Sequence, residues 1–469
     1  MPDGDDVTAP PLYIPHQRSP LQGAPASAVP PDSAAPAFAP PAIFVPPPRR
    51  PGPLAGVLAL VAALAVGAGA IAVANHEPLD TAAEAARPTA KPRPLTPLEL
   101  ANQALERHSE ALLRGDEKAW LAGVDPAQAK LRTRYRWMFR SLRSLGVTHF
   151  DYRTSVHAGD RKNPATVTAD AQIAYCLADM PCPETGAPTV TQTLKIKPVA
   201  GRYVITSLVT RKSDEKQQPA PWEDGNLAFR KGKRVTLIAL PTERRHFAEV
   251  LPLAERAATV NDRFAALVGN PQRRYRIYLA GSKQWKTWYG GITDKWIIAY
   301  ASPLGEAGMD VVLNMDEMRG DPRLLATTIQ HELAHVVTIG GVHRRSWGNG
   351  DMWLKEGIAE YIGWYPQPAT ASWRRPAVRR AVTSGKRPRT IAVTGLKAEA
   401  RLVEGDAFYG LGHFAADCMA KKYGQRALFT FVRLYLREDR DLDPASREAF
   451  GKPFAAVDRA CVAYIRDRA

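Results

Sequence analysis

Apolar residues at helical spacing predict two helices at the start of the folded part of the chain. Thr96 is a suitable helix N-cap, Pro97 fits the first helical position, and Glu99 completes a capping box. Apolar positions then recur with the period of a helix, and they do so again near residues 131–145. The pattern therefore predicts two amphipathic helices between residues 96 and 145.

The pattern then changes to that of strands. In the run near 165–177, apolar residues alternate with others, as in a strand with one buried face. Helices followed by an antiparallel meander make an α+β domain over 95–212. This order of elements resembles the cystatin-like and NTF2-like folds. Without an acidic or histidine cluster on its strands, the domain is interpreted as a spacer or binding module. The four expected strands are roughly 147–157, 165–177, 189–199 and 202–210.

A charged connector over 213–233 leads to a second domain, which we place at 234–469. A long helix is expected near 243–268, and further helices follow the last strand. The second domain is therefore also predicted to be α+β. Its expected strands are 234–240, 274–280, 296–302 and 309–315.

The first 94 residues have a different composition. Residues 1–53 are rich in Pro and Ala and are predicted to be a disordered tail, with a Pro-rich ligand for a partner domain as the alternative. Residues 54–74 are uncharged and long enough to span a bilayer, so they predict one transmembrane helix. Residues 75–94 form a linker. A buried soluble helix and a cleaved signal peptide are the other interpretations of the apolar run.

Charge on either side of the apolar run predicts its orientation. Arg49 and Arg50 precede it, whereas Glu77 and Asp80 follow it. Positive charge stays on the cytoplasmic side, so we expect a single-pass protein of the cell membrane. Its N-terminus would be cytoplasmic and its ectodomain extracytoplasmic.

The formal net charge is +16, and because residues 1–53 hold four Asp and three Arg, the rest of the chain carries +17. An exported basic domain would meet anionic envelope polymers or lipid headgroups, which we expect as partners. No dense block of Lys and Arg with interleaved aromatic residues is present, so nucleic acid is not expected.

Four cysteines lie in the expected ectodomain, where disulfides persist. The pairing Cys176–Cys182 with Cys418–Cys461 is the obvious one, although two other connectivities exist.

Candidate chemistry is concentrated in one short motif, His331-Glu332-Leu333-Ala334-His335. Two histidines four residues apart lie on one face of a helix, so both imidazoles can reach one metal ion. The helix is well specified, because Asp321 is a good N-cap and Gly340 can end it. Neither histidine lies on the apolar stripe of this helix, which favours a metal site over two packed core histidines.

A catalytic zinc ion takes a third protein ligand, and the segment from Trp353 to Tyr361 offers Glu356. Here the chain resembles the gluzincin zinc peptidases, in which HExxH is followed by a helix reading W-L-x-E-G-x-A-x-Y. The resemblance implies a thermolysin-like α+β domain that holds one zinc ion with His331, His335 and Glu356. It covers about 309–424.

The same resemblance implies roles for three more residues. Glu332 is the general base, and Glu360, one turn after Glu356, would hydrogen-bond a zinc-bound histidine. The segment from Phe408 to Phe414 resembles the Y-x-x-G segment that opens a helix in gluzincin aminopeptidases, so Tyr409 would stabilise the oxyanion. His413 is the next candidate for that role, although a packed histidine is the simpler interpretation.

The aminopeptidase motif G-x-M-E-N is missing. Residues 308–315 stand where it would be expected and lack its glutamate, although they can still form the edge strand on which a peptide pairs. The sequence therefore predicts a membrane-anchored zinc metallopeptidase that uses zinc-bound water on a peptide or protein substrate. A non-catalytic, metal-stabilised envelope-binding module is the alternative.

Overall fold

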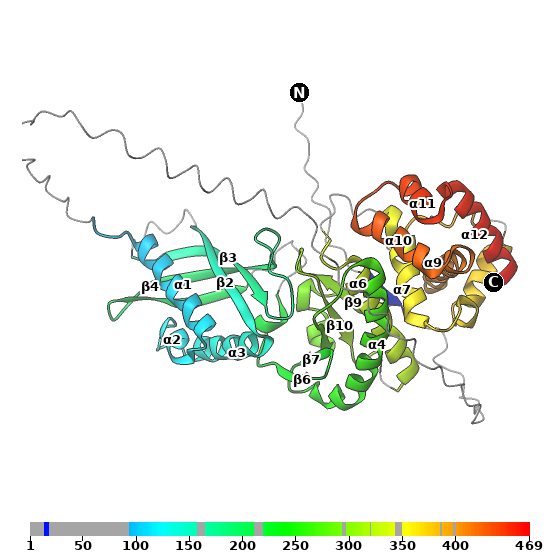
Figure 1. Ribbon diagram of the computed structural model, residues 1–469. Coiled ribbons are helices and arrows are strands. Elements are labelled where there is room, and N and C mark those ends of the chain that lie inside the picture. Colours follow the sequence, from blue (N-terminus) through cyan, green and yellow to red (C-terminus); the bar gives the residue numbers. More distant parts are fainter. Residues whose placement is uncertain are drawn as a thin grey trace, which may run out of the picture. The chain divides into compact units, whose positions relative to one another are not determined.

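The computed structural model describes most of the chain from residue 93 onward (Figure 1). The described ranges are 93–156, 165–210, 219–292, 297–318, 320–342, 349–384, 387–396 and 400–469, with the backbone of Ile14–Gln17. Apart from those four residues and residues 93–94, the expected tail, the apolar run 54–74 and the linker 75–94 lie outside the described residues. None of the helices in the described ranges is long and apolar enough to cross a bilayer.

The first domain is an antiparallel sheet with helices packed on it, as the sequence predicted. Its helices are α1 (Pro97–Arg114), α2 (Glu117–Ala122) and α3 (Ala129–Leu145). Its strands β2 (Val147–Val156), β3 (Val167–Leu177), β4 (Thr189–Val199) and β5 (Arg202–Thr210) pair in chain order as a meander. The short helix α2 was not predicted.

Local sequence accounts for the start of this domain. The Thr96 hydroxyl accepts a hydrogen bond from the Glu99 backbone N–H at 3.3 Å, and the Glu99 carboxylate accepts one from the Thr96 backbone N–H at 2.8 Å. This capping box is the one that the sequence predicted.

The second domain contains a mixed sheet in the order β1-β9-β10-β8-β7-β6. β8 runs parallel to both β7 and β10, and β9 is antiparallel to β10. The expectation that residues 308–315 form an edge strand is wrong, because β10 is hydrogen-bonded on both sides. The strands are β1 (Ile14–Gln17), β6 (Ala228–Lys231), β7 (Val235–Ala239), β8 (Tyr275–Ala280), β9 (Ile297–Pro303) and β10 (Met309–Asn314).

Helices follow the sheet and carry the candidate site. In chain order they are α4 (Phe247–Val268), α5 (Ser282–Trp285), α6 (Pro322–Ile339), α7 (Met352–Trp364), α8 (Arg375–Thr383), α9 (Leu402–Tyr423), α10 (Gln425–Val432), α11 (Leu442–Phe450) and α12 (Phe454–Arg468). The long helix α4, the helix of the HExxH motif (α6) and the next helix (α7) lie where the sequence predicted them.

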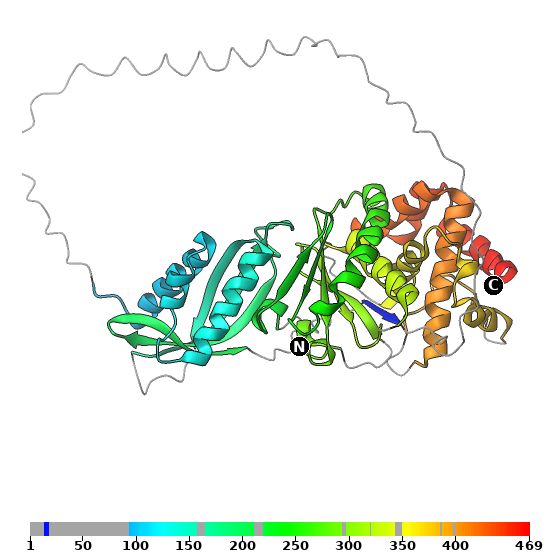
Figure 2. The same ribbon diagram turned by 90° about the horizontal axis from the view of Figure 1, so that it is seen from below.

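The mixed sheet is buried on both faces. Along β10, Val311 and Leu313 pack with the helices, whereas Val312 packs with the first domain. Tyr278 of β8 and Tyr300 of β9 also face the first domain. The first domain thus covers one face of the sheet and α4 and α6 cover the other (Figures 1 and 2). It shares an apolar core with the sheet, and its role as a spacer or binding module stays a prediction.

The two disulfides are those that the sequence favoured. Cys176 is bonded to Cys182 and Cys418 to Cys461. The second bond joins α9 to α12 and so ties the C-terminal helix to the helix that carries Tyr409.

Glu223 lies buried where the chain passes from the first domain to the second, in the short helix Pro221–Glu223. Burial raises the pKa of its carboxyl to about 7, although hydrogen bonds from Gln192 Nε2 (2.8 Å) and the Ala220 backbone N–H (2.9 Å) favour the charged form. The folded protein therefore retains this proton over a pH range in which the unfolded chain, with an ordinary glutamate pKa, has lost it.

This difference predicts a pH-dependent stability. The stability that the folded protein gains from the raised pKa of Glu223 is fully present below about pH 4.5. It declines as the pH rises and is lost above about pH 7. We expect the unfolding free energy of Glu223→Gln, relative to wild type, to increase by roughly 3 kcal/mol between these limits, measured by urea unfolding. The exposed Glu184→Gln serves as control, and equal pH profiles for all three proteins would refute the prediction.

Candidate metal centre

Helix α6 presents His331, Glu332 and His335, all three fully buried. The carboxylate of Asp321 caps the helix by accepting from the Leu324 backbone N–H at 2.8 Å. The apolar side chains of α6 pack on α4 and on the sheet, and this packing fixes the rotation of the helix about its axis. The histidines consequently face α7, on the other side from the sheet.

Polar contacts from other helices fix the position of α6 along its axis. Asn261 Nδ2 on α4 donates to the Gln330 carbonyl at 3.0 Å. Gln330 Nε2, next to the first histidine, donates to the Ile362 carbonyl of α7 at 2.7 Å. The residue just before His331 thus joins α6 to both neighbouring helices.

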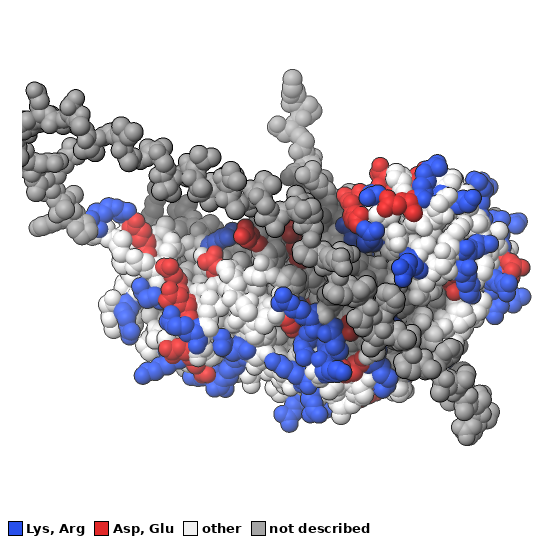
Figure 3. Space-filling model, in the orientation of Figure 1, with Lys and Arg blue, Asp and Glu red and all other residues white. Residues whose placement is uncertain are grey.

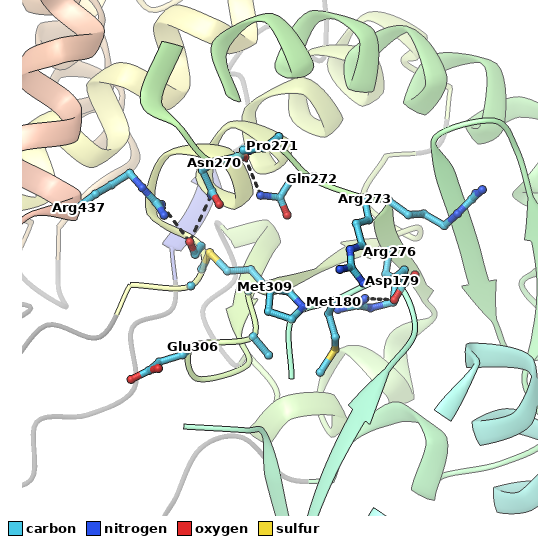
Figure 4. Close-up of a pocket in the computed structure, with 16 residues that line it drawn as sticks. Asp179, Met180, Asn270, Pro271, Gln272, Arg273, Arg276, Glu306, Met309 and Arg437 are labelled. Carbon is cyan, nitrogen blue, oxygen red and sulfur yellow. Dashed lines mark hydrogen bonds and ion pairs between the residues drawn. The ribbon is translucent and has the colours of Figure 1, made fainter. Parts of the chain in front are cut away.

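The C-terminal end of α6 is anchored as well (Figure 4). Asn270 Nδ2 donates to the Val337 carbonyl at 2.9 Å, and Arg437 Nη1 donates to the Gly340 carbonyl at 3.0 Å. These donors satisfy carbonyls that the end of a helix leaves unpaired. A cavity of about 230 Å³ opens beside them, between this end of α6 and the loop at Asp179, and none of the HExxH side chains lines it.

Glu356 on α7 completes a compact group with the two histidines. Its Oε2 lies 3.3 Å from His331 Nε2 and 3.6 Å from His335 Nε2, and the two Nε2 atoms are 3.2 Å apart. These three are the ligand group that the described residues offer to a metal ion. The sequence predicted the same three residues.

The size of this triangle fits zinc. Ligand atoms at roughly 2.0–2.1 Å from a tetrahedral zinc ion lie about 3.3 Å from one another, close to all three distances. The donor set of two imidazoles and one carboxylate leaves a fourth position for water or substrate, as in catalytic zinc sites. Both carboxylate oxygens of Glu332 are buried and accept no hydrogen bond from the described residues, so they remain available beside the three ligands.

Glu360 lies against His331, one of the two histidines of the metal group. Its Oε1 lies 3.2 Å from His331 Nδ1, on the side of the ring away from Glu356. A hydrogen bond from Nδ1–H to this carboxylate leaves Nε2 unprotonated for a metal ion. Glu360 thus lies beside a histidine of the metal group, as the sequence suggested, and its role in orienting that ring stays a prediction.

Arg374 and Asp406 belong to the same cluster and were not found from the sequence. The Arg374 guanidinium pairs with Glu360 Oε2 at 3.2 Å and with the carboxylate of Asp406, and its Cζ lies 5.0 Å from the ring centroid of Tyr409. Arg374 directly precedes α8, in a segment without a recognisable motif. A single sequence gave no signal for it, because only the fold brings it to α7 and α9.

Glycines allow α7 and α9 to approach. A Cβ on Gly357 would lie 2.5 Å from the Gly412 carbonyl oxygen, and one on Gly412 would lie 2.8 Å from Gly357 Cα. Neither position can carry a side chain, because the obstacle is backbone. These are the glycines of the W-L-x-E-G and Y-x-x-G segments, so the two segments touch one another.

Tyr409 and His413 both lie on α9 but have different surroundings. The Tyr409 ring centroid is 6.2 Å from that of His331, and burial, then the nearby Glu356, raises the pKa of the phenol well above its usual range. His413 packs near Trp364 with its ring centroid at 6.5 Å, and burial lowers its pKa to about 4. Tyr409 lies in the third turn of α9 and does not open the helix as expected.

The cluster attracts positive charge. Burial lowers the pKa of the His331 imidazole, but hydrogen bonds with Glu356 and Glu360 outweigh it and raise that pKa to about 10. Burial likewise raises the pKa of Glu332 well above its usual range, and the charges of Glu356 and Glu360 add to the rise. A cation placed among these residues would relieve both effects.

The comparisons with known proteins give a distant likeness. No family model and no curated protein matches the sequence. Among solved structures, the chain matches the crystal structure of an M1 zinc metallopeptidase from Deinococcus radiodurans, with a TM-score of 0.31 and 14% identity, over 69% of this chain and 62% of that one. The chain thus spans less than two thirds of that protein.

The geometry predicts one metal ion per chain. His335→Ala removes one corner of the triangle, so we expect the purified protein to lose its stoichiometric zinc at nanomolar free zinc, measured by elemental analysis after dialysis against a zinc buffer. The exposed His149→Ala is the control and should retain the ion. Full zinc content in His335→Ala would mean that the ligand group is wrong.

Proposed function

We propose that this chain is a zinc metallopeptidase. The observation that carries the proposal is the position of Glu332, which lies buried between two ligand histidines on one helix and has both oxygens available. Zinc binding by His331, His335 and Glu356 does not itself require this carboxylate. A buried acid without a hydrogen bond from the described residues is costly, which favours a role in proton transfer.

The residues divide the reaction between them. A zinc ion bound here supplies a Lewis acid and lowers the pKa of a coordinated water. Glu332 accepts the proton from the attacking water and later gives it to the leaving amine. A positive charge bound beside Glu332 would lower the pKa of its carboxyl, which burial raises, and so favour the ionised form that a base needs.

Tyr409 is the proposed donor to the oxyanion. Its raised pKa keeps the phenol protonated at neutral pH, so the hydroxyl can donate. Negative charge develops on the carbonyl oxygen in the transition state, and a fixed donor at that point lowers the barrier. The Arg374 guanidinium lies over the Tyr409 ring, with Cζ 5.0 Å from the ring centroid, and restricts the movement of the ring.

A peptide in extended form is the proposed substrate. The outer edge of β9 takes such a segment, since the backbone of Ile14–Gln17 pairs with it antiparallel and lies against α6 and α9. β10 offers no free edge and no free acid for an amino terminus: Asp310 Oδ1 accepts from Arg276 Nε at 2.6 Å, and its Oδ2 from the Tyr289 hydroxyl at 2.6 Å. This supports cleavage within a chain over removal of its first residue.

The proposal is tested with a peptide library. We expect Glu332→Gln to keep its zinc and to lose about 10²–10⁴-fold in kcat/KM, because the shape remains and the base is gone. The surface variant Glu106→Gln should match wild type. A non-catalytic, metal-stabilised module is the alternative, and it requires that chelator leave the wild-type background rate unchanged.

Tyr409→Phe tests the oxyanion donor. The ring and its packing remain, so we expect unchanged zinc content and melting temperature, a fall of roughly 10²–10³-fold in kcat, and little change in KM. Tyr361→Phe on α7 removes a hydroxyl that accepts from Gln425 Nε2 at 3.0 Å and is the matched control. Activity of Tyr409→Phe within about twofold of wild type would assign Tyr409 to packing alone.

We also propose that the apolar run 54–74 anchors the chain in the cell membrane, with residues after 75 outside. Basic side chains over both domains (Figure 3) suit anionic envelope polymers or headgroups as neighbours. In a chain inserted in this way Ile14–Gln17 would lie across the bilayer from β9, so the edge of β9 that this segment occupies in the structure would be open to a peptide. Protease added to intact cells should remove the ectodomain, and full protection would refute this orientation.

A further inference from the structure

We propose that Arg374 is a positioning residue for the metal centre, which holds the His331 ring through Glu360 and fixes the Tyr409 ring at the same time. Arg374, Glu360 and Asp406 take no direct part in the proposed reaction. The effect on zinc needs only the metal site, whereas the effect on Tyr409 rests on the proposed peptidase function.

The contacts form a continuous path to the metal ligand. One oxygen of Glu360 faces His331 Nδ1 at 3.2 Å, and the other faces Arg374 Nε at 3.2 Å. The carboxylate is thus held from both ends. Glu360 cannot turn away from the imidazole without losing its ion pair with Arg374. That loss is costly, because both side chains are fully buried.

The other side of the guanidinium is held as well. Arg374 Nη1 pairs with Asp406 on α9, and both side chains are buried. Asp406 lies one turn before Tyr409, and the Arg374 Cζ lies 5.0 Å from the Tyr409 ring centroid. One side chain therefore connects the acid that orients His331 with the helix turn that carries the tyrosine.

The chemistry of arginine suits this position. A guanidinium is planar, always charged, and directs several N–H groups along fixed lines, so it can bind two carboxylates and lie against an aromatic ring together. Lysine has one compact charge that cannot make all three contacts. Arg374→Lys thus keeps the positive charge and removes the planar set of N–H groups, so it tests the contribution of those directed contacts.

The experiment measures zinc affinity by competition with a chromophoric chelator. We expect Arg374→Lys to bind zinc about 10–100-fold more weakly, as happens when partners behind metal ligands are changed. The visible absorption of the cobalt-substituted protein should change shape, because the His331 ring is less well oriented. These readouts follow the metal site itself and do not depend on peptidase activity.

A matched control separates positioning from stability. Arg276 is also buried and also pairs with two acids, Asp179 at 2.5 Å and Asp310 at 2.6 Å. These ion pairs lie between the first domain and the sheet and do not include any residue of the metal group. Arg276→Lys should lower the melting temperature and leave zinc affinity and the cobalt spectrum unchanged. Equal zinc affinity in Arg374→Lys and wild type would overturn the proposal.

A double-mutant cycle tests the path. If Arg374 acts through Glu360, then Arg374→Lys should cost less than about threefold in zinc affinity once Glu360→Gln is present. If the double variant loses zinc affinity by the product of the two single-variant losses, Arg374 does not act through Glu360. If Arg374→Lys does not fold, Asp406→Asn carries the test: a weaker zinc affinity in the same cycle supports the proposal, and an unchanged one overturns it.

The part on Tyr409 has its own readout. In zinc-saturated Arg374→Lys we expect kcat to fall with KM little changed, and the fall should be smaller in the Tyr409→Phe background. An unchanged kcat with weakened zinc affinity would remove Tyr409 from the proposal and keep His331. An inactive wild type would remove the proposed function and leave the zinc result standing.

Discussion

The cost of burying charge is the constraint on which this structure depends. Glu332, Glu356, Glu360 and Asp406 lie among α6, α7 and α9 with almost no exposed surface. A buried carboxylate is tolerated only with a cation or several donors beside it. Arg374 supplies the positive charge beside Glu360 and Asp406. A dication among His331, His335 and Glu356 would supply it beside Glu332 and Glu356. The same ion that performs the proposed chemistry would thus also stabilise the folded protein, since its binding energy is available only in the folded state.

Arg374 links α7 and α9, because it pairs with Glu360 on α7 and with Asp406 on α9. The two helix backbones also meet directly, and Gly357 and Gly412 make this possible because neither carries a side chain at the contact. A third glycine, Gly363, lies against His331. A Cβ added to Gly363 would be 3.2 Å from the Cβ of His331. The sheet and α4 then act as a rigid support, because α6 is attached to them by its apolar face and by the amide of Asn261.

Much of the fold could be predicted, because its signals are local. The Thr96 capping box, the strands of the first meander and the Asp321 cap of α6 depend on neighbours in sequence, and each lies where it was predicted. The ligand set could be predicted because helix geometry brings His331 and His335 together and the resemblance supplied Glu356. Arg374 and Asp406 could not, since their partnership is decided by how α8 and α9 pack. The position of β10 inside the sheet was missed for the same reason. The pattern of apolar residues indicates that a strand is buried, but it does not indicate which strands pair with it.

Asp310 shows how the same kind of residue takes a different task at a different place in the fold. β10 carries this acid next to the position where the aminopeptidase motif was sought, yet both of its oxygens are engaged by Arg276 and Tyr289. Arg276 in turn reaches Asp179 of the first domain at 2.5 Å. The polar side chains on this face of the sheet thus join the two domains, and an acid held by two donors in a buried site has no remaining capacity to bind a substrate amine. The first domain covers this face of the sheet, and the proposed peptide substrate would accordingly pair with the edge of β9 beside α6.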